Sequence, residues 1–262
     1  PRKRFGQHFL HDKHVIDRII DNINLESDTS LVEIGPGRGA LTLPLLARKS
    51  PLHVIEIDND LADRLETGNN QNGQLIVYRG DALKFDFCKM LPGRLTIVGN
   101  LPYNISTPLL FHLLRHTSCI DEMLFMLQKE VADRICANPG ASDYGRLSIM
   151  VQSVCRVQHL FDVSAASFTP PPKVESSIIR LSPANDLATT ISDYQLFSII
   201  VRTAFSKRRK TIRNALKNLA TEEMIVAAGV SPDSRPEQLS VQTYADLANI
   251  IHQYAVNENS TE

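Results

Sequence analysis

The 262-residue sequence has no tryptophan and only four cysteines, Cys88, Cys119, Cys136 and Cys155. No two of these cysteines have the C-x-x-C spacing of a zinc or thiol-redox site, so we expect no metal site and four reduced thiols. The sequence also lacks an apolar run of about 18 residues, the length that spans a bilayer. It therefore predicts a protein that binds no metal and crosses no membrane.

Neither sign of charge is in excess, since 28 Lys and Arg residues stand against 29 Asp and Glu residues. This balance excludes a protein whose whole surface is basic, but it leaves room for a local basic patch. A charged start, Pro1–Arg4, is followed by Phe5–His8 where a secretory signal would have an apolar segment. We therefore expect a cytoplasmic protein, and because no segment indicates a strong subunit interface, a monomer.

The first two thirds of the chain alternate between strand-like and helix-like segments. Apolar and β-branched runs predict strands at 31–34, 52–57, 75–78, 95–98, 123–127 and 178–181. Helices are predicted between them, one starting with Thr107 at the N-cap and Pro108 at the first helical position, and another at 129–136. Strands that alternate with helices predict a doubly wound α/β fold with a mostly parallel sheet.

A polar break at 182–186 predicts a domain boundary, which gives one domain at 1–183 and a second at 184–262. After the break the apolar residues recur at helical spacing, as at Phe197, Ile200, Val201 and Ala204. The second domain is therefore expected to be small and all-helical.

Four candidate ligand-binding features each follow a predicted strand. They are the loop with Gly35, Gly37 and Gly39, then Glu56, Asp81 and Asn100. Ligands of an open parallel sheet bind beyond the carboxyl ends of its strands, so we expect these features to form one site. Glycines at alternate positions let the backbone approach a ligand closely, although a tight strand-to-helix turn can also use glycine.

Glu56 lies 21 positions after Gly35 (56 − 35), where a carboxylate can accept hydrogen bonds from both hydroxyls of a ribose. Asp81 can accept a hydrogen bond from an adenine amino group, although aspartate is common in turns for backbone reasons. Because the glycine loop also fits a relaxed dinucleotide fingerprint, these residues leave open both a nicotinamide cofactor and S-adenosylmethionine (SAM).

The tetrapeptide Asn100-Leu101-Pro102-Tyr103 follows the fourth predicted strand. It forms either a plain turn, which Asn and Pro favour, or a catalytic motif that holds an aromatic amine for methylation. Such an amine is a poor nucleophile because its lone pair is delocalised, so an enzyme must hold both amine hydrogens with acceptors. The Asn100 side-chain oxygen and the Leu101 carbonyl provide two acceptors, Pro102 restricts the loop, and Tyr103 can stack on the base.

With Glu33-x-Gly35-x-Gly37-x-Gly39, this tetrapeptide resembles the SAM-dependent adenine amino methyltransferases. Four further segments resemble the ribosomal RNA adenine dimethyltransferases, and most of all their small-subunit branch. These segments are Arg4–Leu10, Asn104–Pro108, Phe168–Val174 and Arg208–Thr211. The resemblance covers the chain from Arg2 to the region of Tyr244.

The resemblance implies a seven-stranded Rossmann-like SAM-binding domain followed by a helical domain. It also implies SAM-dependent dimethylation of two adjacent adenosines in a hairpin near the 3′ end of 16S rRNA, within the small ribosomal subunit. Carried onto this sequence, the cofactor contacts are His8, Leu10, Gly35, Gly37, Glu56, Asp81 and Asn100. Asn100, Leu101 and Pro102 would hold the target amine, and Tyr103 and Phe168 would flank the flipped adenine.

A local basic excess predicts where RNA binds, because Tyr194–Thr221 contains seven Lys and Arg residues and no Asp or Glu. The seven are Arg202, Lys207, Arg208, Arg209, Lys210, Arg213 and Lys217. We expect three of them, Lys210, Arg213 and Lys217, to share one helix face, although most charge runs are simply solvated helix faces. Arg2, Lys3 and Arg4 are expected to add a second contact.

Three other functions stay open on the sequence alone. A nicotinamide dehydrogenase would share the glycine loop and Glu56 but would leave Asn100–Tyr103 without a role. A dimethyltransferase acting on large-subunit rRNA would share the catalytic residues. A non-catalytic RNA-binding assembly factor would not need an intact Asn100–Tyr103.

Overall fold

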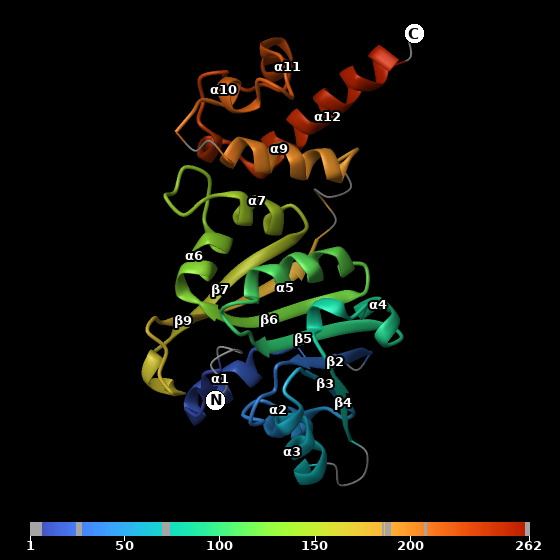
Figure 1. Cartoon of the computed structure of the whole chain (residues 1–262), viewed down its shortest axis with the longest axis vertical. Helices are drawn as coiled ribbons and strands as arrows, with labels where there is room; N and C mark the ends of the chain where they lie inside the picture. Colours follow the sequence, from blue (N-terminus) through green and yellow to red (C-terminus); the bar gives the residue numbers. More distant parts are fainter. Residues whose placement is uncertain are drawn as a thin grey trace. The chain divides into compact units, whose positions relative to one another are not determined.

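The computed structural model describes residues 7–24, 28–69, 74–184, 186, 190–206 and 209–259. The chain divides into two compact units, whose elements are labelled in Figure 1. The first unit contains Pro1–Ala132 and Val157–Pro183, and the second contains Asp133–Arg156 and Ala184–Glu262. The expected domains 1–183 and 184–262 therefore differ from this division at residues 133–156, which group with the helical unit.

The described strands are β1 (Phe9–Leu10), β2 (Thr29–Ile34), β3 (Leu52–Glu56), β4 (Leu75–Arg79), β5 (Arg94–Asn100), β6 (Ile120–Gln128), β7 (Cys155–Val163), β8 (Phe168–Thr169) and β9 (Ser176–Pro183). The helices are α1 (Lys13–Asp21), α2 (Thr42–Arg48), α3 (Asn59–Asn69), α4 (Phe87–Met90), α5 (Ser106–Leu113), α6 (Lys129–Cys136), α7 (Arg146–Gln152), α9 (Tyr194–Ser206), α10 (Ile212–Leu216), α11 (Glu222–Ala227) and α12 (Val241–Asn259). Short 3₁₀ turns are η2 (Ala82–Lys84), η3 (Leu114–His116), η4 (Ala165–Ser167) and η5 (Pro236–Gln238).

Seven strands form one sheet in the order β4-β3-β2-β5-β6-β9-β7. The neighbours from β4 to β6 are parallel, and β9 is antiparallel to β6. Every residue of β3 is buried, and so is nearly every residue of β5, because apolar runs of this kind form strands covered on both faces. The predicted mostly parallel α/β sheet is confirmed.

The core of the first unit lies where strand side chains meet the covering helices. Its buried residues include Ile20 of α1, Leu31 of β2, Leu45 of α2 and Val98 of β5, each no more than 2% exposed. A two-stranded antiparallel sheet of β1 and β8 adds Leu10 and Phe168 to the same cluster. The segment before α1 is therefore anchored in the core.

Helices fill the second unit, as predicted. In α9 the four residues Phe197, Ile200, Val201 and Ala204 are buried on one face, as their spacing indicated. Residues 133–156 group with these helices because hydrogen bonds join them. The Tyr144 hydroxyl donates to the Leu239 carbonyl oxygen at 3.1 Å, and the Ser153 and Tyr194 hydroxyls lie 3.2 Å apart.

Two predictions of local structure need correction. Strand β7 was not expected, because its alternation of exposed and buried residues lacks the apolar run that marks the other strands. Helix α5 begins at Ser106 after an N-cap at Ile105, so Thr107 is not the N-cap and Pro108 is the third helical residue. Proline fits there because the first turn of a helix leaves its N–H groups without intrahelical acceptors.

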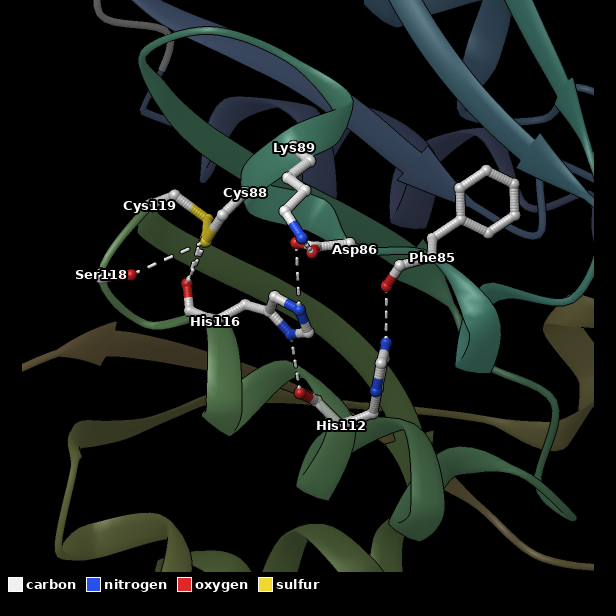
Figure 2. Close-up of polar contacts among 8 residues, drawn as sticks. All are labelled: Phe85, Asp86, Cys88, Lys89, His112, His116, Ser118 and Cys119. Carbon is white, nitrogen blue, oxygen red and sulfur yellow. Dashed lines mark hydrogen bonds and ion pairs between the residues drawn. A yellow bond between two sulfur atoms is a disulfide. The ribbon is translucent and has the colours of Figure 1, made fainter.

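The expectation of four reduced thiols is wrong for two of the cysteines. Cys88 of α4 and Cys119, which precedes β6, form a disulfide with their Cα atoms 5.4 Å apart (Figure 2). The sequence could not indicate this pair, because the two residues are 31 positions apart and only the fold brings them together. Cys136 and Cys155 are free thiols, as expected.

None of the described helices combines the length and the apolar character that crossing a membrane requires.

Candidate active site

A pocket opens at the carboxyl ends of neighbouring strands in the first unit. Its wall contains Gly35, Glu56, Asp81 and Asn100, which follow or end β2, β3, β4 and β5 in turn. Strand β2 lies between β3 and β5, so the pocket sits where the strand order reverses, which is where open α/β sheets bind ligands. The structure thus brings together the four features that the sequence singled out, and His8, Leu10 and Gly37 line the same pocket.

Glu56 holds the glycine loop in place with both carboxylate oxygens. Oε2 accepts a hydrogen bond from the Gly37 N–H at 3.1 Å, and Oε1 accepts one from the Asp58 N–H at 2.9 Å. Gly37 has φ +58°, and an added Cβ would lie 3.3 Å from the Phe9 ring, so a side chain there would be strained and tightly packed. Because each carboxylate oxygen has two lone pairs, Glu56 can accept two further hydrogen bonds from a ligand.

Burial shapes the ionisation of two carboxyl groups in this wall. It raises the pKa of Glu56, against the hydrogen bonds from Asp58 and Gly37, which lower it. Burial also raises the pKa of Glu33 to about 8, although the Thr42 hydroxyl donates to its Oε2 at 2.7 Å. A positively charged ligand group close to either carboxyl would favour its ionised form and lower its pKa.

The part of the pocket beyond Glu56 has an apolar wall and one carboxylate. Asp81 caps η2 by accepting a hydrogen bond from the Leu83 N–H at 3.0 Å. Ile57 and Ala82 line the same region, and Ile57 is 46% exposed. Sequence reasoning missed these two residues, although an isoleucine directly after the strand-ending carboxylate was a usable signal. This wall can enclose a flat heterocycle whose amino group faces Asp81.

Gly99, next to Asn100, was also missed. An added Cβ at Gly99 would lie 2.5 Å from the Ile34 carbonyl oxygen, so only glycine lets β5 approach β2 this closely. This approach sets the position of Asn100 beside the glycine loop.

The orientation of the Asn100 side chain follows from its hydrogen bond. Its Nδ2 donates to the His8 carbonyl oxygen at 3.1 Å. A carbonyl oxygen can only accept, so the amide nitrogen must face His8, and Oδ1 is the atom that can accept from a ligand. The fold therefore orients the acceptor that the sequence predicted.

Tyr103 is held at both its hydroxyl and its ring. The hydroxyl lies 2.8 Å from the Ser176 Oγ, and the ring stacks on His8 with centroids 5.5 Å apart. The Nδ1 of His8 donates to the Pro170 carbonyl oxygen at 2.8 Å, and this hydrogen bond has to break if the ring moves. His8 covers one face of Tyr103, so a base can stack on that face only after His8 has moved.

In this structure Phe168 does not line the pocket, so its predicted role beside a base stays a prediction. Phe168 is 2% exposed, packs in the core cluster with Leu10, and is not among the residues that line the pocket. The cause is the pairing of β1 with β8, which sets Leu10 opposite Phe168. Sequence reasoning could not foresee this pairing, because the two strands have two residues each and are far apart in the chain.

The predicted RNA-binding residues are only partly described. Arg202, Arg209, Lys210, Arg213 and Lys217 are exposed in the second unit. Lys207, Arg208 and Arg2–Arg4 lie outside the described residues. The prediction that Lys210, Arg213 and Lys217 share a helix face is wrong, because α10 spans only Ile212–Leu216. Arg213 also contacts Glu222 at 3.3 Å and Asp233 at 3.0 Å, two carboxylates just beyond the acid-free segment.

Within the described part of the chain, no group of three or more His, Cys, Asp or Glu side chains is arranged to hold a metal ion. The chemistry that the pocket offers comes from hydrogen-bond acceptors, apolar walls and an aromatic ring.

Solved structures with this fold define the class of the protein. A dimethyladenosine transferase from Plasmodium falciparum matches with a TM-score of 0.77 and 29% identity, over 95% of this chain and 98% of that chain. The 23S rRNA methyltransferase ErmE matches with a TM-score of 0.72 and 25% identity, over 94% and 100%. The chain has the Rossmann-like methyltransferase fold with a helical region after it.

The family is shown by sequence. The model of the ribosomal RNA adenine dimethylase family matches residues 1–253, so the chain belongs to this family. Ribosomal RNA small subunit methyltransferase A of Pseudomonas aeruginosa is 52% identical over 250 residues, which cover 95% of this chain and 93% of the relative. The protein of the same name from Alcanivorax borkumensis is 49% identical over 251 residues, with 95% and 89% covered.

Proposed function

We propose that this protein uses SAM to dimethylate the exocyclic amino groups of two adjacent adenosines in a 3′-terminal hairpin of 16S rRNA. The observation that carries the proposal is the pocket in which Glu56 and the oriented Asn100 face one ligand site. Membership of the family supports the reaction type. The names of the relatives from Pseudomonas and Alcanivorax support the small subunit as substrate.

The pocket fits SAM by its own chemistry. Glu56 can accept from the ribose hydroxyls, and the Gly37 position, where a Cβ would meet Phe9, leaves the backbone open to a close ligand. Ile57 and Ala82 suit the faces of the adenine, and Asp81 suits its amino group. The bound cofactor supplies a methyl group on a positively charged sulfur.

Asn100 and its neighbours prepare the target amine for methylation. Asn100 Oδ1 accepts one amine hydrogen and the Leu101 carbonyl oxygen accepts the other, which directs the nitrogen lone pair out of conjugation with the ring. The His8 carbonyl keeps the Asn100 amide in the required orientation. Most of the acceleration then comes from positioning, because the methyl donor is already activated. The cationic amine loses a proton to water after transfer.

The target adenine has to leave its helix to reach this site. Tyr103 offers a stacking face once the His8 ring has swung away, and a stack of this kind contributes about 1–3 kcal/mol. The Ser176 hydroxyl bonded to the Tyr103 hydroxyl keeps the ring at a set angle for the incoming base. His8 therefore occupies the base position until the RNA arrives.

The second unit binds the RNA backbone outside the catalytic pocket. Arg202, Arg209, Lys210 and Lys217 are exposed there and suit the phosphate backbone, whereas Arg213 forms ion pairs with two carboxylates. The partner in this proposal is 16S rRNA within the small ribosomal subunit, and the proposed protein is a monomer of the cytoplasm. Recognition depends on the shape of the RNA helix more than on its sequence.

Reversing two charges of this surface is expected to weaken subunit binding. In the double variant Arg209→Glu/Lys210→Glu, a plot of log affinity against log salt concentration should become shallower by about two units, since each lost phosphate contact removes about one. Filter binding to unmethylated small subunits at several salt concentrations measures this slope.

A matched control is Arg64→Glu/Arg115→Glu, which changes the net charge equally at two exposed arginines of the first unit. This control should keep the wild-type slope. If the Arg209/Lys210 variant also keeps it, the second unit is not the RNA-binding surface.

The whole proposal is tested by incubating the protein with tritiated SAM and unmethylated small subunits and then mapping the labelled bases. We expect label only on two adjacent adenosines of the 3′-terminal hairpin, each as dimethyladenosine. Label on large subunits alone would identify a large-subunit enzyme, and no label on either would identify a non-catalytic factor. Each of these two results contradicts the proposal.

A further inference from the structure

The disulfide lies outside the pocket, but it encloses the segment that carries the catalytic residues. Its closed loop runs from Cys88 to Cys119 and contains β5, the tetrapeptide Asn100–Tyr103 and α5. The two cysteines therefore pin both ends of the segment on which the proposed chemistry depends. Nothing in the reaction itself uses them.

A second set of contacts joins the same two chain segments without sulfur (Figure 2). His112 Nε2 donates to the Phe85 carbonyl oxygen at 2.8 Å, and His116 Nε2 lies 3.6 Å from an Asp86 carboxylate oxygen. Lys89 contacts the same carboxylate at 3.0 Å. Phe87 of α4 is fully buried beside both histidines. These contacts can keep the segments docked when the sulfur atoms separate.

The surroundings of the two sulfur atoms suit both oxidation states. The His116 carbonyl oxygen lies 3.2 Å from Cys119 Sγ and 3.6 Å from Cys88 Sγ. A disulfide has no hydrogen to donate to this carbonyl, whereas each thiol of the reduced pair does. An acceptor for the reduced form is thus already in place. Cys88 is only partly buried and Cys119 is 9% exposed, so Cys88 is the sulfur that a reagent can reach.

We infer that Cys88 and Cys119 form a reversible thiol–disulfide site that stabilises the catalytic segment when it is oxidised. Oxidation closes the loop around Asn100–Tyr103 and lowers the conformational entropy of the unfolded chain. Reduction releases the loop, and the histidine and Phe87 contacts keep it folded. The inference concerns the segment's stability and does not depend on which RNA is methylated.

The exchange balances with a dithiol as the partner reagent. One thiolate of the dithiol attacks Cys88 Sγ, the Cys88–Cys119 bond breaks, and Cys119 leaves as a thiolate that takes up a proton. The second thiol of the dithiol then attacks the mixed disulfide and releases Cys88, which is protonated in turn. The dithiol ends as its own disulfide, having supplied two electrons and two protons. In the reverse exchange this disulfide is the oxidant: it accepts the two electrons and two protons, and the Cys88–Cys119 bond forms again.

The test uses the full chain equilibrated with reduced or oxidised dithiothreitol under native conditions. After oxidation we expect an intact mass lower by two hydrogen atoms and protection of Cys88 and Cys119 from alkylation, with native reduction reversing both. The Tm of the oxidised form should be higher by about 5–10 °C. Hydrogen exchange should be slower across 88–119 in the oxidised form.

Two variants show whether the effect of oxidation comes from Cys88 and Cys119. Cys88→Ser/Cys119→Ser should have the same Tm in both conditions, whereas Cys136→Ser, at the partly exposed free thiol, should respond like the wild type. Failure of the 88–119 bond to form would overturn the inference. A bond that the dithiol reduces only in denaturant, or a Tm that oxidation does not raise, would overturn it as well.

Discussion

Asn100→Ala is expected to lower the rate of methyl transfer about 100- to 1000-fold, the cost typical of removing one preorganised hydrogen-bonding group from an active site. The variant loses the Oδ1 that accepts an amine hydrogen, so the nitrogen lone pair stays delocalised in the base. It also loses the hydrogen bond to the His8 carbonyl oxygen. Single-turnover assays with tritiated SAM and unmethylated small subunits measure the rate.

Cofactor binding by Asn100→Ala is expected to weaken by less than about tenfold, because one hydrogen bond contributes about 0.5–1.5 kcal/mol. Asn104→Ala is the matched control, since Asn104 is an exposed asparagine four residues along the chain and outside the pocket wall. It should keep wild-type turnover. Unchanged turnover in Asn100→Ala would refute the proposed role of the carboxamide.

Glu56→Ala is expected to weaken SAM binding about 100-fold or more, because two hydrogen bonds from ribose hydroxyls to a charged carboxylate contribute about 1.5–3 kcal/mol each. The same change removes the acceptors of the Gly37 and Asp58 N–H groups, so the glycine loop loses its anchor as well. Calorimetric titration with S-adenosylhomocysteine, which cannot transfer a methyl group, measures the affinity without turnover.

Glu56→Gln keeps part of both functions of the side chain. The glutamine keeps one oxygen acceptor and the shape of the side chain, so it should bind more tightly than the alanine variant and more weakly than the wild type. Both variants should unfold cooperatively, which circular dichroism checks. Wild-type affinity in Glu56→Ala would show that the carboxylate does not hold the ribose.

Acid should weaken cofactor binding through the same residue. The pKa of Glu56 is raised by burial, so the carboxyl gains a proton at a higher pH than an exposed glutamate does. The protonated form accepts ribose hydrogen bonds less well, and affinity therefore falls as the pH drops through this raised pKa. In Glu56→Gln this dependence should be lost, which makes the pH profile a second readout of the titration above.

Local patterns predicted the strands that build the site. The runs at 31–34, 52–57, 75–78 and 95–98 lie within or close to β2, β3, β4 and β5, because strands buried on both faces need continuous apolar sequence. The polar residues that end such runs must meet at one edge of a parallel sheet. Glu56, Asp81 and Asn100 could therefore be predicted to share a pocket before any coordinates were known.

Contacts between distant segments had no such signal. The pairing of β1 with β8 buries Phe168, the carbonyl of His8 orients Asn100, and the fold joins Cys88 to Cys119. Each contact joins residues that are 31 or more positions apart. No periodicity in either segment indicates which other segment it contacts. The same holds for the ion pair of Arg213 with Asp233, which lies 20 positions along the chain.

The motifs alone were thus enough for the family, the reaction type and most of the residues that the fold gathers in one pocket, because the chemistry of an amine and a ribose restricts which side chains can serve. The orientation and the exposure of those residues came only from the folded chain, because they depend on atoms of segments that are distant in the sequence. Folding bonded the Asn100 amide nitrogen to the His8 carbonyl oxygen, covered one face of Tyr103 with His8 and buried Phe168 in the core.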